Sequence, residues 1–225
     1  MATSKALTIA GFDPSGGAGV LADVRTFAAF GLQSAAAITS ITFQNNTGVF
    51  GAMHQTPEAV SAQIQPLLEN LTVTCAKTGM LPTREVVLEV ARLFRETDLP
   101  APVVDPVIRS SSGQSLMDEA ALDQLVTELI PLARLVTPNI PEAETLTATA
   151  IASEADMRNA AAAIRKLGAR AVLIKGGHLA PGDAIDVLDD EGNVTVFREQ
   201  RIEGAELHGS GCILSAAIAA GLGKG

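Results

Sequence analysis

The segment His208-Gly209-Ser210-Gly211-Cys212 has the composition of an anion-binding turn. The apolar run that follows, Ile213 to Ile218, predicts a helix. Small residues leave consecutive backbone N–H groups accessible at the start of that helix, where the helix dipole favours negative charge. The segment therefore predicts a site that stabilises charge on a transferring phosphoryl group, with Gly209, Ser210 and Gly211 as the anion hole.

Cys212 is the reactive side chain of this segment. A cysteine in the first turn of a helix is expected to have a lowered pKa, so Cys212 could act as a base or as a hydrogen-bond acceptor. The alternative is a buried cysteine that packs as a small hydrophobic residue. The flanking glycines favour the functional interpretation.

A second glycine-rich segment, Gly11 to Gly19, follows a predicted strand and precedes a predicted helix. Glycines allow the backbone to approach a ligand closely, and the helix start favours an anion or a polar group. A flexible loop is the alternative. A loose dinucleotide-binding pattern also occurs here, but the next predicted strand, which ends near Phe43, lacks the acidic residue that a ribose requires.

Other polar side chains lie at the ends of predicted strands. Asn139 and Glu142 could cap a helix or orient water molecules on a Mg²⁺ ion, and a cap is the simpler interpretation. Lys175 could face the phosphates of ATP or mark an ordinary turn. Asp105 could be a turn residue or a carboxylate near a metal ion.

Short β-rich runs alternate with helical periodicity, which predicts a mainly parallel sheet with helices on both faces. The expected strands are Ala6–Ala10, Ala35–Phe43, Thr72–Lys77, Pro102–Asp105, Leu135–Thr137 and Ala171–Lys175, followed by a hairpin of Asp183–Leu188 and Val194–Arg201. The expected helices are Val20 to Ala28, Pro57–Leu71, Thr83–Arg95, Leu116–Ala133, Glu154–Leu167 and Cys212–Leu222. No internal repeat or domain boundary is evident.

Composition limits the possible classes of protein. The 225 residues are 47% hydrophobic and carry a formal net charge of −9, so a basic nucleic-acid-binding surface is not expected. No run is long enough to span a bilayer, and a membrane partner is not expected either. The two cysteines form no disulfide framework, which favours a reducing, cytoplasmic location.

Taken together, these segments resemble one family, the hydroxymethylpyrimidine/phosphomethylpyrimidine kinases of thiamine biosynthesis, in the ribokinase-like superfamily. The resemblance implies a three-layer α/β/α fold with a mainly parallel central sheet, as a single kinase domain over residues 1–225 that lacks its C-terminal helical tail. The motifs that carry it are Thr8-Ile9-Ala10-Gly11 with Asp13 to Gly19, Ala22-Asp23, Gln44-Asn45-Asn46-Thr47-Gly48-Val49, Lys77-Thr78-Gly79-Met80-Leu81, Val104-Asp105-Pro106-Val107, Thr137-Pro138-Asn139, Lys175-Gly176-Gly177-His178 and Gly209-Ser210-Gly211-Cys212.

The resemblance implies that ATP phosphorylates 4-amino-5-hydroxymethyl-2-methylpyrimidine and then its monophosphate, with Mg²⁺ as cofactor and a homodimer as the assembly. It implies that Gln44 hydrogen-bonds the pyrimidine and that Cys212 occupies the position of the catalytic base. Positions that line the substrate pocket are Gly11, Asp23, Met80 and Val107, and positions of the magnesium motif are Asn139 and Glu142.

Two alternatives remain open at this point. A pyridoxal kinase of the same branch is one, although Gln44 and Met80 argue against it. The other is a non-catalytic pyrimidine-binding protein, which would need neither Cys212 nor the glycines of its turn.

Overall fold

The computed structural model describes residues 5–45, 48–110, 113–177, 179, 183–202 and 208–225 of the chain. Asn46, Thr47 and His178, which belong to the motifs above, lie outside the described residues. The strands are β1 (Lys5–Phe12), β2 (Gln33–Asn45), β3 (Gly48–His54), β4 (Val73–Thr78), β5 (Val103–Val104), β6 (Leu135–Val136), β7 (Ala171–Lys175), β8 (Ala184–Asp190) and β9 (Asn193–Glu199). The helices are α1 (Gly19–Ala29), α2 (Pro57–Leu68), α3 (Arg84–Glu96), α4 (Glu119–Gln124), η1 (Leu125–Leu129), η2 (Ile130–Leu132), α5 (Ile140–Thr147), α6 (Glu154–Arg165) and α7 (Ser210–Lys224).

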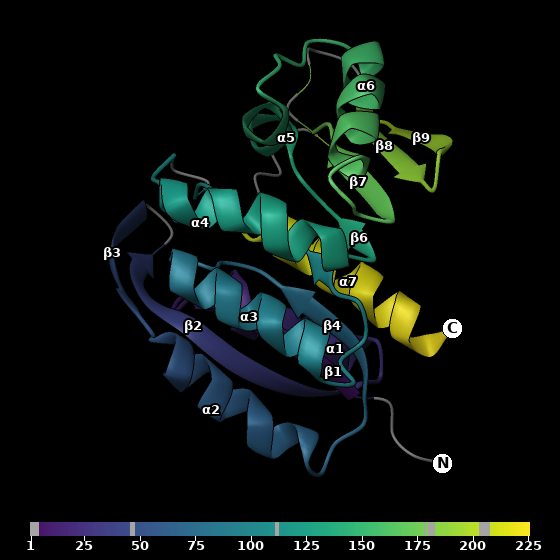
Figure 1. Ribbon diagram of the computed structural model, residues 1–225. Coiled ribbons are helices and arrows are strands. Elements are labelled where there is room, and N and C mark those ends of the chain that lie inside the picture. Colours follow the sequence, from purple (N-terminus) through teal and green to yellow (C-terminus); the bar gives the residue numbers. More distant parts are fainter. Residues whose placement is uncertain (1–4, 46–47, 111–112, 178, 180–182, 203–207) are drawn as a thin grey trace.

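The described strands form one sheet in the order β3-β2-β1-β4-β5-β6-β7-β8-β9 (Figure 1). The central strands, from β2 through β1, β4, β5 and β6 to β7, pair in parallel. The outer pairs β2–β3, β7–β8 and β8–β9 are antiparallel. The predicted mainly parallel sheet is therefore confirmed, and its antiparallel part includes the predicted hairpin.

Helices cover both faces of the sheet, which confirms the predicted three layers (Figure 1). A larger core lies between the sheet and the helices α2 to α6, and it contains Leu7, Val90 and Ile164. A smaller core lies under α1 and α7, where Phe27 packs beside alanines of α7. Because both faces are buried there, β5, β6 and most of β7 read as continuous apolar runs rather than as alternating ones. None of the described helices is long and apolar enough to cross a bilayer.

The largest differences from the predictions concern two regions, while the helix expected over Pro57–Leu71 ends earlier, at Leu68. The helix expected over Leu116–Ala133 begins only at Glu119, after the Asp118 cap, and its second half consists of a π-helical and a 3₁₀ segment. Pro131 explains this ending, because proline has no N–H and its ring collides with the preceding helical turn. Strand β3 was not predicted, since its seven residues include two glycines, which are uncommon in strands.

The parallel strands end at one edge of the sheet, where the amino-terminal ends of α1, α5 and α7 also lie. Asp105 directly follows β5, Asn139 lies three residues beyond β6, and Lys175 ends β7. Ligands of open α/β sheets bind at this carboxyl edge. The fold therefore gathers most of the predicted site residues in one region.

Candidate active site

The turn that begins α7 depends on glycine at position 209. Gly209 is the residue before the helix and has a φ of 79°, a left-handed conformation that favours glycine. A Cβ atom on Gly209 would lie 2.0 Å from the carbonyl oxygen of Gly17, so the turn packs directly against the glycine-rich loop. The N–H groups of the first helical turn have no partner within the helix and can face an anion.

Lys175 lies beside this turn. Its Nζ atom would be 3.1 Å from a Cβ atom on Gly211, and it forms an ion pair of 3.1 Å with Asp105 Oδ1. Asp105 also accepts a hydrogen bond from Ser215 on α7, at 3.2 Å. The structure therefore joins Lys175, Asp105 and the start of α7 into one charged cluster.

Cys212 lies in the first turn of α7, but its environment differs from the prediction. Burial of the thiol raises the pKa of Cys212 to about 11, and the carboxylates of Asp105 and Asp23 add to the rise. The positive charge of Lys77 and a hydrogen bond from the backbone N–H of Gly19 act in the opposite direction. The predicted lowering of the pKa by the helix start is therefore wrong, and the resting residue is a thiol.

Asp23 forms an ion pair with Lys77, and neither side chain has exposed surface. The Lys77 Nζ atom lies 2.8 and 2.9 Å from the two carboxylate oxygens, and Thr8 donates a third hydrogen bond of 2.6 Å. Both oxygens of Asp23 are thus held by protein groups. Direct contact between Asp23 and a substrate stays a prediction, and its observed role is to neutralise Lys77 beneath the site.

Asn139 and Glu142 form the helix cap that the simpler interpretation predicted. The Asn139 side chain accepts a hydrogen bond from the N–H of Glu142, and the Glu142 carboxylate accepts one from the N–H of Asn139, both at 2.9 Å. Burial raises the pKa of Glu142 to about 7, with a further contribution from the charge of Asp105. The positive charge of Lys175 opposes this rise, so Lys175 interacts electrostatically with both Glu142 and Asp105.

The predicted pocket residues lie around the ends of β1, β2 and β5. A Cβ atom on Gly11 would lie 3.1 Å from the sulfur of Met80, so these two residues are in contact. Met80 is held in place by Thr39, whose hydroxyl donates to its carbonyl oxygen at 2.6 Å. Gln44 and Val107 are half-buried near the ends of β2 and β5.

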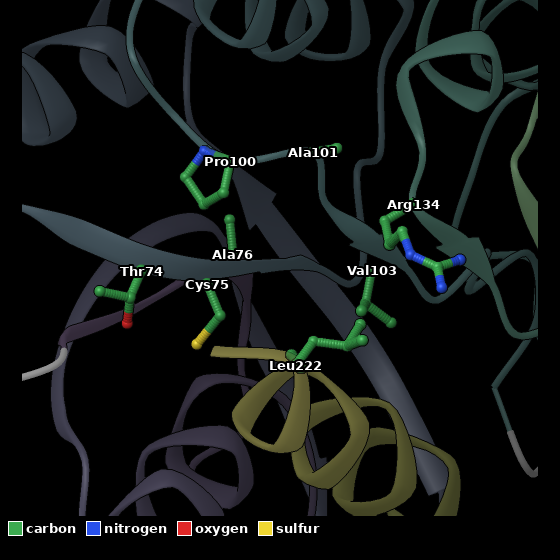
Figure 2. A pocket seen from close by; sticks show the side chains of 9 residues that line it. Thr74, Cys75, Ala76, Pro100, Ala101, Val103, Arg134 and Leu222 are labelled. Atoms are coloured by element: carbon green, nitrogen blue, oxygen red, sulfur yellow. The ribbon is translucent and has the colours of Figure 1, made fainter. Parts of the chain in front are cut away.

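A separate cavity of about 240 Å³ lies at the opposite edge of the sheet (Figure 2). Its lining includes Cys75 at the start of β4, Arg134 before β6 and Leu222 near the end of α7. None of the predicted site residues lines it, so this cavity is not the candidate active site.

Three residues near the site were given no role by the sequence reasoning: Lys77, Ser215 and His208. Lys77 interrupts the apolar strand β4, and a charge at a buried strand position requires a buried partner. That signal was available, but its partner, Asp23, is 54 residues away in the sequence. Nothing in the local pattern distinguishes Ser215 or His208 from an ordinary polar residue.

A mainly parallel sheet, an anion-directed helix start and a lysine beside it at the carboxyl edge define a kinase of the ribokinase-like class. The family described as phosphomethylpyrimidine kinase matches residues 13–225 of this chain. The chain belongs to this family.

Relatives of known name agree with this assignment. The hydroxymethylpyrimidine/phosphomethylpyrimidine kinase of Streptomyces coelicolor is 45% identical over 97% of this chain and 81% of its own length. The protein of the same name from Rhizobium meliloti is 46% identical over 99% of this chain and 84% of its own length.

Solved structures show the same fold. The phosphomethylpyrimidine kinase of Clostridium difficile superposes with a TM-score of 0.87 and 38% identity, over 99% of this chain and 92% of that one. The pyridoxal kinase of Bacillus subtilis, solved as an ADP complex, superposes with a TM-score of 0.90 and 36% identity, over 100% and 85%. The predicted ribokinase-like fold is therefore confirmed.

Proposed function

We propose that this chain transfers the γ-phosphoryl group of ATP to hydroxymethylpyrimidine and then to its monophosphate, as a step of thiamine biosynthesis. The names of relatives that are 45% and 46% identical to it support this activity. A relative from Geobacter sulfurreducens, 42% identical, is named a bifunctional thiamine biosynthesis protein. The structural observation that carries the proposal is the packing of Lys175 against Gly211, which gives a phosphoryl group both a cation and helix-start N–H groups.

The proposed reaction uses these groups in a defined way. The oxygen of the substrate hydroxymethyl group attacks the γ-phosphorus, the bond to the β,γ-bridging oxygen breaks, and ADP leaves. The N–H groups of Gly211 and Cys212, together with the ammonium group of Lys175, stabilise the charge on the equatorial oxygens. Because the transition state is loose, the hydroxyl proton is lost late rather than before the attack. It passes to the sulfur of Cys212 in its thiolate form, after the proton of the thiol has moved to solvent.

The chemistry of the carboxylates fits a Mg²⁺ ion at this edge. Glu142 and Asp105 are both buried, and the negative charge of Asp105 raises the pKa of Glu142, so a divalent cation would relieve this repulsion. No group of three or more His, Cys, Asp or Glu side chains in the described part of the chain is arranged to hold a metal ion alone. This suits Mg²⁺, which commonly binds one or two carboxylates and completes its shell with water and substrate phosphates. When bound, it would neutralise phosphate charge, and Asn139 would orient one of its water molecules.

A substrate panel tests the proposal. The protein is assayed with ATP, Mg²⁺ and, in turn, hydroxymethylpyrimidine, its monophosphate, pyridoxal and ribose. We expect turnover with the first two substrates and none with ribose. The second candidate, pyridoxal phosphorylation, is favoured by the TM-scores of 0.90 and 0.89 to pyridoxal kinases of Bacillus subtilis and Staphylococcus aureus. A higher kcat/KM for pyridoxal than for hydroxymethylpyrimidine would overturn the first proposal in favour of the second.

We also propose that the protein is a cytoplasmic homodimer. The free cysteines Cys75 and Cys212 support a reducing compartment. The edge strand β3 and its neighbour β2 expose a set of large apolar side chains: Ile41, Phe43, Phe50 and Met53. Phe50 is 70% exposed and Met53 59% exposed, and clusters of this kind commonly mark protein interfaces. Light scattering tests this: the native chain would have the dimer mass, and Phe50→Glu with Met53→Lys would have the monomer mass.

A further inference from the structure

A hydrogen bond between His208 and Asp13 joins two segments that are 195 residues apart in the sequence. The Nε2 atom of His208 lies 3.0 Å from Oδ2 of Asp13, whose residue is only 1% exposed. Burial would raise the pKa of Asp13, but hydrogen bonds from Ser15, His208 and Ala18 hold it below its usual value. Asp13 is therefore a carboxylate, and the His208 ring donates its Nε2 proton to it.

Asp13 fixes the shape of the glycine-rich loop before α1. Its Oδ1 accepts hydrogen bonds from the N–H and the hydroxyl of Ser15, at 2.8 and 2.7 Å. Its Oδ2 accepts the N–H of Ala18 at 2.9 Å, and Ala18 is the residue that precedes the first turn of α1. The next residue, Gly19, donates its N–H to the thiol of Cys212. A change at Asp13 would therefore move the loop that contacts the proposed catalytic cysteine.

His208 fixes the other side of the same contact. It directly precedes Gly209, the residue at which the turn of α7 begins. A Cβ atom on Gly17 would lie 2.5 Å from Cδ2 of His208, so the imidazole ring lies against the bare backbone of the loop. The turn and the loop are thus held together by one ring, one carboxylate and two glycine surfaces. No contact of this set involves the predicted substrate or metal residues.

We infer that His208 is a positioning residue: its bond to Asp13 holds the anion-binding turn of α7 and the glycine-rich loop of α1 in one fixed arrangement. This inference rests on the proposed phosphoryl transfer. Backbone N–H groups stabilise a transition state only when they already point at the developing charge. Loss of the bond lets the turn of α7 and residues 13–19 of the loop move apart, which lowers kcat, while Met80 keeps its bond to Thr39 in the predicted pyrimidine pocket.

The first test separates binding from turnover. For His208→Leu, which keeps the volume but removes the donor, we expect kcat to fall on the order of 10- to 100-fold. The KM for hydroxymethylpyrimidine is expected to stay within about twofold of the native value. His208→Gln, whose amide N–H replaces the Nε2 donor, is expected to recover most of the loss. The matched control is His54→Leu, because His54 bonds Ser40 at the edge of the sheet and is expected to be silent.

A double-mutant cycle tests whether the two residues act through each other. Asp13→Ala is expected to lower kcat at least as much as His208→Leu, since it also removes the bonds to Ser15 and Ala18. The double variant is expected to be no slower than Asp13→Ala alone, because the contact is lost only once. Multiplicative losses, or a rise in KM with unchanged kcat, would overturn the inference.

Hydrogen exchange gives a readout that does not require turnover. In His208→Leu, the amides of residues 13–19 and 209–213 are expected to exchange faster together, while those of α3 stay unchanged. If the native protein phosphorylates none of the pyrimidines, the proposed function fails, whatever the exchange data show. If the native protein is active and His208→Leu leaves both segments and kcat unchanged, the positioning role alone is wrong.

Discussion

Lys77 and Asp23 are in contact at 2.8 Å with no exposed surface on either side chain, directly beneath the turn that carries Cys212. Burial opposes the charged form of Lys77, but the negative charge of Asp23 outweighs it and holds the pKa of Lys77 above its usual value. The pair connects β4 to α1, and a third bond from Thr8 completes it. A buried pair of this kind is costly to break from one side only.

The first prediction concerns this pair. Lys77→Met leaves the Asp23 carboxylate buried without its cation, with the hydroxyl of Thr8 still donating to it, and we expect the change to lower the free energy of unfolding by about 3–5 kcal/mol. Lys77→Met with Asp23→Leu is expected to be more stable than Lys77→Met alone, because no charge remains buried. Urea denaturation measures both. Equal stability of the single and double variants would show that the ion pair does not determine the loss.

The second prediction concerns Cys212. Cys212→Ala removes the group that receives the substrate proton, and we expect kcat to fall by about 10²-fold or more. The Kd for hydroxymethylpyrimidine is expected to change little, since the pocket residues are elsewhere. Cys75→Ala is the matched control, because Cys75 lines the cavity at the opposite edge of the sheet. Steady-state kinetics and calorimetry give the two quantities, and a loss in kcat of only a few-fold would reduce Cys212 to a packing residue.

The third prediction concerns Gln44, where substrate binding rather than kcat is expected to change most. Its side-chain amide can both donate to and accept from an aminopyrimidine edge. Gln44→Ala is expected to weaken pyrimidine binding by about 1–2 kcal/mol, which is roughly 5- to 30-fold in Kd, with a smaller effect on kcat. Gln65→Ala on α2 is the control, because in the described part of the chain Gln65 donates to Ser61 on the same helix. Unchanged affinity by calorimetry would remove Gln44 from the site.

The fourth prediction is a dependence of stability on pH. The pKa of Glu142 is about 7 in the folded protein, raised by burial from an ordinary value of 4.5. Between these values the folded chain holds a proton that the unfolded chain has lost, so this contribution to stability declines as the pH rises from 4.5 to 7. Relative to Glu142→Gln, the native protein is expected to lose about 1–3 kcal/mol across this range. A constant difference between the two proteins would contradict the raised pKa.

Magnesium extends this prediction. Mg²⁺ binds the carboxylate form of Glu142. Roughly millimolar Mg²⁺ is therefore expected to raise Tm more above pH 7 than below it. Glu142→Gln is expected to lose most of this response. Glu144→Gln on the same helix is the control, because Glu144 accepts only the N–H of Ile151 in the described contacts. A Tm response that is independent of pH and of Glu142 would exclude this residue as a magnesium ligand.

The fifth prediction compares Gly209, which precedes α7, with Gly221 inside the helix. A Cβ atom on Gly209 would meet the Gly17 carbonyl at 2.0 Å, at a φ of 79°. Gly209→Ala is therefore expected to cost about 1–3 kcal/mol and most of the activity. Gly221 lies within the helix and has open space around its Cβ position, so Gly221→Ala is expected to be neutral or to add up to about 1 kcal/mol. Thermal unfolding of both variants tests the contrast.

The sequence predicted the alternation of elements well, because apolar runs and turn residues are local signals. The bounds of β7, Ala171–Lys175, agree with the prediction, and the helix predicted over Val20 to Ala28 spans Gly19–Ala29. Strand β3 was missed because Gly48 and Gly51 weaken its pattern and only its pairing with β2 stabilises it. Local patterns carry no information about such pairing.

In the candidate site, too, features set by neighbouring residues were predicted, and features set by residues distant in the sequence were not. The turn at Gly209 and the cap at Asn139 follow from residues that are close in sequence, and both were anticipated. The raised pKa of Cys212 was not, because it depends on burial of the thiol and on the charges of Lys77, Asp105 and Asp23, which lie in β4, after β5 and in α1. The bond between His208 and Asp13 was missed for the same reason. Burial in the fold, together with the charges that the fold brings near, decides the pKa of this thiol, whereas its helix position alone suggests the opposite.

Helix α7 has a consequence for how this protein can evolve. Its alanines Ala216, Ala219 and Ala220 form much of the smaller core, while its first turn carries Cys212. A substitution that loosens the helix against the sheet therefore alters turnover and thermal tolerance together. In a deep mutational scan, α7 would accept fewer replacements than the exposed strand β9, and adaptation to a new substrate would proceed through the ends of β2 and β5, where side chains can change without disturbing this helix.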